Sequence, residues 1–363
     1  MLGFVQNIFA PPAHPIGVDF GTGTLRLAQV QSEGDDFKLL AAASAEIPAA
    51  IQGDPAARLQ FFSETIRDLL VNGKFHGRRA ILGLPSSAVH IQHLTVQPAQ
   101  EKILKEAIYA QARQNLPFEP EHALLRHEIA GKSQDKNNPC LHVVVMAADT
   151  RWVNQYIAAA KKGRLDVIGM NMPQLALIDC FTNVYRRAAD QQSVRMYVDI
   201  GGTGTRVTIA QGKRMLFARN LATGGDHLTA AVASALEISP ENARTIRLKL
   251  GAGSIENSEL VDSVLRLAIE KLASDLDRCR KEHESLFPSL RVQRLIFVGG
   301  EARLEALCEQ ISDQLKIPGQ TGDSLCRMVR NSRIGIESAI DRRHPQPAWA
   351  AAIGLTIGPR HSD

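Results

Sequence analysis

Two short stretches of the chain place an aspartate just before a turn of glycines and threonines. The first, VDFGTGT, contains Asp19, and the second, VDIGGTGT, contains Asp199. Glycines allow backbone N–H groups to approach an anion closely, and threonine hydroxyls add further donors. A carboxylate at each strand end can hold a hydrated magnesium ion, which needs few protein ligands. The repeat therefore predicts two hairpins that grip a triphosphate from both sides, with Asp19 and Asp199 as metal ligands.

A third glycine turn lies in FVGGEA, where Gly299 and Gly300 follow an expected buried strand. Two adjacent glycines there would let a base and a ribose lie against the start of the next helix. One such turn alone is ordinary. Three such turns in this order favour a nucleotide cleft, because one short motif often occurs by chance whereas three together rarely do.

Other phosphate-binding motifs do not fit the chain. Gly21-Thr22-Gly23 begins like the dinucleotide motif GxGxxG, but Arg26 stands at the third glycine position and a strand follows instead of a helix. A P-loop would also need a Gly-Lys-Ser/Thr sequence, and none follows. The repeated hairpin remains the best explanation of these residues.

The composition is that of a globular chain of 363 residues, long enough for two to three domains at roughly 150 residues each. The net charge is +4 and aromatic residues make up 5%, values that argue against a nucleic-acid partner. The five cysteines form no CxxC pair, which indicates a reducing compartment. No apolar run approaches the roughly 18 to 20 residues of a membrane helix, so no direct membrane span is expected.

Hydrophobic periodicity places the elements that must position these turns. Strands flank each aspartate-containing turn, and Asp54-Pro55 predicts the N-cap and first residue of a helix. A strand, helix, strand, strand, helix series predicts a compact α+β module inserted in the first domain. Its first helix, at 101–116, has an apolar stripe that we expect to be core. A long helix ending at Leu286 is expected to bury one apolar face, formed by Leu260, Val264, Leu267 or Ala268, Leu272 and Leu276.

These motifs together resemble those of the superfamily of actin, heat-shock chaperones and sugar kinases. Within it, the chain is similar to the PilM family of pilus assembly proteins, whose nearest relative is the cell-division protein FtsA. The similarity runs from about Ile16 to Gly358, and the stretches that carry it are AILGLPSSAVHIQHLTV, EAIYAQARQNLPFEPEH, VVMAADTRWVNQYIAAAKKG, LATGGDHLTAAVASAL and VGGEARLEAL. The resemblance implies an α/β, actin-like two-lobe fold of duplicated ribonuclease-H-like domains.

An inserted α+β module in the first lobe and a helical subdomain in the second are also implied. The expected first lobe comprises 14–87 and 166–192 with the C-terminal helix 346–359, and its inserted module comprises 88–165. The expected second lobe comprises 193–235 and 291–345, and its subdomain comprises 236–290.

The resemblance also implies a set of site residues with ATP and Mg²⁺ as cofactors. Relatives carry Glu, Lys and Arg on the helix that meets the nucleoside, whereas this chain has Arg244, Arg247 and Leu248, of which Arg247 can still reach a ribose or phosphate. Gln174 is the only polar candidate for positioning an attacking water, so we expect ATP binding with slow or absent hydrolysis. The candidate nucleotide-binding residues are Asp19, Gly21, Thr22, Gly23, Thr24, Asp199, Gly201, Gly202, Thr203, Gly204, Gly224, Gly225, Asp226, Arg247, Gly299, Gly300 and Glu301.

The function implied is that of an actin-like, ATP-binding cytoplasmic adaptor of type IV pilus assembly, peripheral to the inner membrane through protein partners. It would hold the N-terminal cytoplasmic peptide of a PilN-like inner-membrane protein and link the pilus alignment complex to its motor, with self-association left open. Three alternatives remain: a nucleotide-independent scaffold of a pilus or related secretion system, an FtsA-like filament-forming protein, and a small-molecule kinase of the same superfamily.

Overall fold

The computed structural model describes residues 12–133, 139–251, 259–329, 334–335, 338 and 340–358. Contacts within the chain group it into two units. Unit 1 comprises Met1–Leu84, Gln155–Val184 and Asp323–Asp363, and unit 2 comprises Pro85–Asn154 and Tyr185–Gly322. This grouping puts most of the predicted module in unit 2 and 323–345 in unit 1. The sequence predicts the module in the first lobe and 323–345 in the second. The subdomain boundaries stay a prediction.

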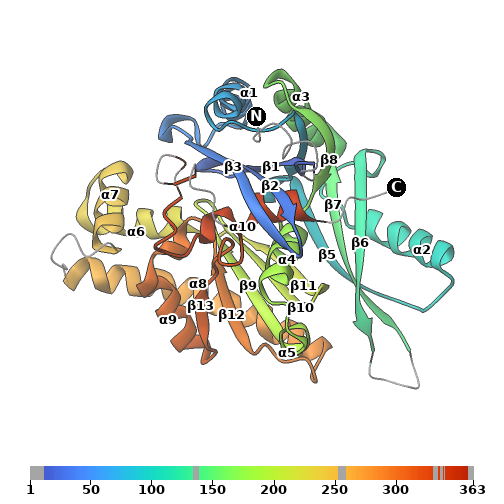
Figure 1. Cartoon of the computed structure of the whole chain (residues 1–363). Coiled ribbons are helices and arrows are strands. Elements are labelled where there is room, and N and C mark those ends of the chain that lie inside the picture. Colours follow the sequence, from blue (N-terminus) through green and yellow to red (C-terminus); the bar gives the residue numbers. More distant parts are fainter. Residues whose placement is uncertain are drawn as a thin grey trace. The chain divides into compact units, whose positions relative to one another are not determined.

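Unit 1 is built on a mixed five-stranded sheet with the order β3-β2-β1-β4-β8 (Figure 1). Its strands are β1 (Ile16–Phe20), β2 (Thr24–Glu33), β3 (Asp36–Glu46), β4 (Arg79–Gly83) and β8 (Asp166–Asn171). The first three form an antiparallel meander, and β4 and β8 continue the sheet in parallel with β1. The predicted strand, turn and strand around Asp19 are therefore confirmed.

The helices of unit 1 anchor this sheet. They are α1 (Pro55–Asn72), α4 (Pro173–Val184), α10 (Ala350–Ile357) and part of α3 (Thr150–Lys162). Asp54 caps α1 as predicted, because its carboxylate accepts from two backbone N–H groups of the first turn. α10 lies against β1 and α4, where Gly17 and Gly354 leave no space for a Cβ atom. These glycines let the backbones touch, and the contact holds in place the strand that carries Asp19.

Unit 2 repeats this arrangement in a second mixed sheet with the order β11-β10-β9-β12-β13. Its strands are β9 (Val194–Ile200), β10 (Thr205–Gln211), β11 (Arg214–Leu221), β12 (Arg294–Val298) and β13 (Gly319–Thr321). Three antiparallel strands are again followed by parallel ones. Asp19 and Asp199 thus occupy equivalent places, each on the central strand of its sheet just before a hairpin.

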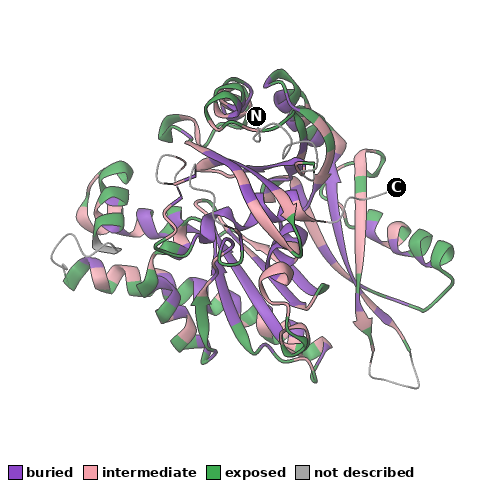
Figure 2. Ribbon diagram, in the orientation of Figure 1, coloured by how far each residue is buried: buried purple, intermediate pink, exposed green. Residues whose placement is uncertain are grey.

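The helices of unit 2 cover a sheet whose central strand β9 is buried along its whole length (Figure 2). They are α5 (Ala188–Gln192), α6 (Gly225–Leu236), α7 (Pro240–Gly251), α8 (Glu259–Leu286) and α9 (Glu305–Leu315). Leu272 and Leu276 of α8 join the core, as predicted. The prediction was wrong for Leu260, which is 50% exposed, because the buried side chains of the α8 N-terminal half stand at other positions, such as Ile269. Of the alternatives Leu267 and Ala268, Ala268 packs against the core and Leu267 is 66% exposed.

The predicted α+β module contains a three-stranded antiparallel sheet ordered β5-β7-β6. Its elements are β5 (Val89–Val96), α2 (Glu101–Arg113), β6 (Ala123–Lys132) and β7 (Leu141–Asp149). Ile108 and Ala112 of α2 are fully buried in its core, which confirms the predicted core stripe. The sheet also contacts β11, where the His93 ring stacks on Phe217 with 4.4 Å between ring centroids, and His93 Nε2 donates to Ala218 O at 2.9 Å. These contacts explain why the module groups with unit 2.

Short 3₁₀ turns join several of these elements, at Ala49–Ile51, Ser86–Ala88, Pro120–His122, Glu301–Arg303 and Pro347–Trp349. Across the residues that the structure describes, no helix combines the length and the apolar character that a bilayer crossing requires.

Candidate functional site

The second hairpin makes a tight glycine turn between β9 and β10. The N–H of Gly201 donates to the carbonyl oxygen of Gly204 at 2.9 Å, and this bond closes the turn. Thr205 follows with its hydroxyl donating to the carbonyl oxygen of Thr223 at 2.7 Å. The turn is therefore tied to the end of β11 as well as to its own strands.

The glycine pair before α6 is joined to this turn by two backbone hydrogen bonds. The N–H of Gly225 donates to Gly201 O at 2.9 Å, and the N–H of Asp226 donates to Gly202 O at 2.8 Å. Gly224 has no space for a side chain, because a Cβ atom there would collide with the hairpin backbone. The first turn of α6, with the positive end of its dipole, thus lies directly against the second hairpin.

The third glycine turn lies beside Asp199. β12 runs parallel to β9 with Val298 opposite Asp199, and Gly299 follows with a φ of +90°. This left-handed conformation favours glycine, and a Cβ atom would in addition collide with Asp199 Oδ1 and Ile200 O. Glu301 then begins a 3₁₀ turn, and its carboxylate covers Gly225 so closely that an alanine there would collide with it.

A buried ion pair links α7 to this group. Arg247 is 2% exposed, and its Nη1 and Nη2 lie 2.5 Å and 3.2 Å from the two carboxylate oxygens of Glu301. Its Nε also donates to Thr229 Oγ1 of α6 at 3.3 Å. The guanidinium therefore holds Glu301 in place over the glycine turn, so three elements distant in sequence meet at one point.

Asp199 is itself paired within the hairpin. It is 3% exposed, and its Oδ2 accepts from Arg206 Nε at 2.7 Å and lies 2.6 Å from Arg206 Nη2. Arg206 stands opposite Asp199 in the β9–β10 register. Within the described ranges, no group of three or more His, Cys, Asp and Glu residues is arranged to hold a metal. Asp199 thus already has a cationic partner in the guanidinium of Arg206, and the predicted metal role of Asp199 stays a prediction.

The first hairpin repeats this register in unit 1. Asp19 is 5% exposed and stands opposite Arg26 in the β1–β2 pairing. The carbonyl oxygen of Gly23 accepts from the N–H of Ile47 at 3.0 Å, which ties the turn to the end of β3. The structure therefore places the predicted residues in two sets. Asp19, Gly21, Thr22, Gly23 and Thr24 lie in unit 1, and all the other candidate nucleotide-binding residues lie together in unit 2.

Gln174, the candidate for positioning water, lies near the start of α4 and is 1% exposed. Bulk water does not reach a side chain buried to this degree, so the structure gives its predicted role no support. Two ion pairs were not predicted from the sequence: Arg206 neutralises Asp199, and Glu301 neutralises Arg247. A signal was present for the first pair, because an arginine follows each aspartate at the same spacing in both hairpins, as Arg26 and Arg206.

Comparisons with known proteins agree with this architecture. The family described as type IV pilus assembly protein PilM matches residues 17–358. A solved structure of a PilM-PilN type IV pilus biogenesis complex contains a chain that is similar with a TM-score of 0.78 and 20% identity, over 95% of this chain and 98% of that one. The ethanolamine utilization protein EutJ from Carboxydothermus hydrogenoformans is similar with a TM-score of 0.55 and 16% identity, over 96% of this chain and 90% of that one. The fold is actin-like, with duplicated ribonuclease-H-like sheets.

Proposed function

The chain belongs to the family of type IV pilus assembly protein PilM, and from this premise we propose that it is a nucleotide-binding adaptor of pilus assembly. Its proposed partner is the N-terminal cytoplasmic tail of a PilN-like inner-membrane protein, which would bring the chain to the cytoplasmic face of that membrane. The support for this partner is a solved PilM-PilN complex that contains a chain similar to this one over nearly the full length of each of the two.

The observation that carries the nucleotide proposal is the meeting of three glycine turns in unit 2. The hairpin turn, the start of α6 and the turn after β12 are bonded or packed directly onto one another. The N–H groups of Gly201, Gly225 and Asp226 are bonded within the chain, so the other backbone N–H groups of these turns are the proposed donors to phosphate oxygens, and the helix start adds a favourable dipole. We propose ATP as the ligand of these turns, and the part of Asp19 and its glycine turn in unit 1 stays a prediction.

The two ion pairs of unit 2 described above, Arg247 with Glu301 and Arg206 with Asp199, have proposed parts in holding this ligand. Arg247 holds Glu301 rigidly beside Gly225, so that the carboxylate can accept hydrogen bonds from a ribose hydroxyl. Arg206 balances the charge of Asp199 and lowers the repulsion that a buried carboxylate would exert on phosphates. Mg²⁺ bound to the phosphates would further neutralise their charge, and Asp19 stays its proposed protein ligand.

Calorimetric titration with Mg-ATP tests the nucleotide proposal. Wild-type protein should show saturable binding, and the Arg247→Met/Glu301→Gln variant should bind more weakly, because both members of the ion pair are removed without leaving a buried charge. Glu270→Gln on the exposed face of α8 is the matched control. An absence of binding by the wild type would refute the nucleotide part.

The partner is tested separately by fluorescence anisotropy with a labelled peptide. The peptide should carry the N-terminal cytoplasmic sequence of a PilN protein from the same organism as this chain, and a scrambled peptide is the control. Saturable binding of the first peptide alone is expected. Equal binding of both peptides would refute the adaptor role.

A nucleotide-independent scaffold is the second candidate, and a specific observation favours it. Arg247 and Asp199 are buried and already have ionic partners within the chain, so neither needs a ligand to satisfy its charge. In this case the peptide would bind as expected and Mg-ATP would not. The two titrations together separate the two candidates.

A further inference from the structure

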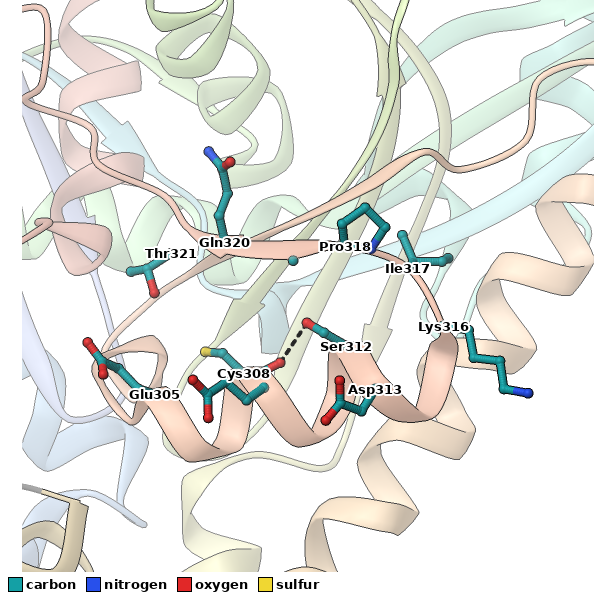
Figure 3. Close-up of a pocket in the computed structure, with 11 residues that line it drawn as sticks. Glu305, Cys308, Ser312, Asp313, Lys316, Ile317, Pro318, Gln320 and Thr321 are labelled. Atoms are coloured by element: carbon teal, nitrogen blue, oxygen red, sulfur yellow. Dashed lines mark hydrogen bonds between the residues drawn. The ribbon is translucent and has the colours of Figure 1, made fainter.

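A groove lies at the edge of the unit 2 sheet, away from the glycine turns. α9 ends in a turn at Lys316, and the chain returns alongside the helix as β13 (Figure 3). The groove between them has a volume of about 960 Å³. Figure 3 shows Cys308 and Ser312 pointing from α9 towards the strand, with Glu305 near Thr321 at one end.

β13 is the last strand of its sheet and has one open edge. It pairs in parallel with β12, where Leu295 N–H donates to Pro318 O, and Gly322 N–H donates to Phe297 O. In a parallel ladder this pattern turns the N–H and C=O groups of Gly319 and Thr321 to the opposite side. Within the described part of the chain, no recorded backbone bond between elements uses these four groups. An edge of this kind is a template for another strand.

The two faces of β13 differ in charge, because only the face toward α9 meets a row of acidic side chains. On the α9 side, Glu305, Glu309 and Asp313 recur every four residues and are all exposed, and Lys316 stands at the far end. On the other face of β13, the side chain of Gln320 points away from α9 (Figure 3) and lies within hydrogen-bond distance of Arg294 and Tyr185. The side chains of a strand added to this edge would alternate between the two faces of the sheet. Only the alternate side chains on the α9 face would therefore meet the acidic groups.

The floor of the groove provides no reactive group. Cys308 is 6% exposed, and burial, together with the nearby carboxylates of Glu305 and Glu309, raises the pKa of its thiol to about 12. The thiol therefore stays protonated and does not act as a nucleophile. Recognition at this groove has to rest on backbone pairing and charge.

We propose that β13 is a docking edge for an extended peptide segment of a partner protein, with basic side chains at alternate positions. The segment would add a strand to the unit 2 sheet, with its backbone bonded to Gly319 and Thr321. Its basic side chains would lie over the acidic face of α9. This surface is separate from the glycine turns, so the chain would hold a second partner independently of nucleotide.

Amide NMR of the ¹⁵N-labelled full chain tests this proposal. The probe is a ten-residue peptide in which lysine alternates with threonine, and the control peptide replaces each lysine with glutamate. The amide chemical shifts of Gly319 and Thr321 should change when the lysine peptide is added and should not change with the glutamate peptide. The Glu305→Gln/Glu309→Gln variant should bind it about fivefold more weakly, since each exposed charge pair contributes modestly. The control variant Glu106→Gln/Glu270→Gln removes the same amount of charge from exposed positions outside the groove, and it should bind the lysine peptide as tightly as the wild type does.

A backbone variant separates strand addition from simple charge attraction. Thr321→Pro removes an outward N–H that the β12–β13 ladder does not use, and it should reduce binding while leaving Mg-ATP titration unchanged. Equal affinities of the two double glutamate variants, or shifts confined to residues outside the groove, would overturn the proposal. If Thr321→Pro does not fold, the affinities of the two double glutamate variants for the lysine peptide still test whether the peptide binds at this groove.

Discussion

The buried pair of Asp199 and Arg206 should contribute strongly to the stability of unit 2. Two charge-assisted contacts, of 2.6 Å and 2.7 Å, join the guanidinium to one carboxylate oxygen. Asp199 is 3% exposed and the Arg206 side chain is 14% exposed, so solvent screens the pair little. Removing one partner of such a pair costs about 3–5 kcal/mol, because the other charge stays buried. Allowing for the partial exposure of Arg206, we expect Arg206→Gln to cost about 3 kcal/mol.

Urea unfolding and thermal unfolding of the full chain measure this cost. A loss of about 3 kcal/mol corresponds to a fall of roughly 6–12 °C in Tm for a unit of this size. The double variant Asp199→Asn/Arg206→Gln removes both charges and should recover most of the loss. A cost of less than about 1 kcal/mol for Arg206→Gln would refute the reasoning, since Asp199 would then be adequately solvated without its partner.

Three further predictions follow from the same contacts. Arg247→Met should cost about 3–5 kcal/mol in urea unfolding, because Glu301 would lose its buried partner; a cost below about 1 kcal/mol would contradict this. Gly225→Ala should cost about 1–3 kcal/mol and weaken Mg-ATP binding in calorimetry, because the added methyl collides with the Glu301 carboxylate; unchanged values would show that Glu301 moves freely. Burial lowers the pKa of His93, so the unfolded state binds protons more readily. The unfolding free energy should therefore fall as the pH drops below about 6.5, and a smaller fall in His93→Gln is the check.

Local features of the fold were predictable because neighbouring residues determine them. Asp54 followed by Pro55 can cap a helix from its own side chain, whatever the rest of the chain does. The apolar spacing that includes Ile108 and Ala112 likewise predicts the buried side of α2, and the structure confirms it. The repeated aspartate and glycine turn predicted two equivalent hairpins, because the two stretches differ only by one inserted glycine and by Phe20 in place of Ile200.

Contacts between distant residues could not be predicted in this way. Arg247 and Glu301 are 54 residues apart, and nothing in the periodicity around either residue identifies the other as its partner. The strand β13 is only three residues long and shows little alternation of polar and apolar residues. Its pairing with β12, and not its own sequence, therefore identifies it as a strand. On α8 the expected apolar face included Leu260 and left Leu267 or Ala268 open, because a long amphipathic helix with many leucines allows more than one face to be drawn.

The repeated pairing of aspartate and arginine bears on the choice between a nucleotide switch and a scaffold. Both hairpins carry the two residues opposite each other, so the arrangement belongs to the repeat and not to one unit. In unit 2 the arginine neutralises the carboxylate within the chain, and a magnesium ion at Asp199 would have to displace a buried ion pair. Nucleotide binding that persists when EDTA removes the metal would therefore fit the geometry of this unit. Binding that strictly requires magnesium would be explained by a metal on the phosphates with Asp19 as its proposed ligand, and it would not by itself show that the pair at Asp199 opens.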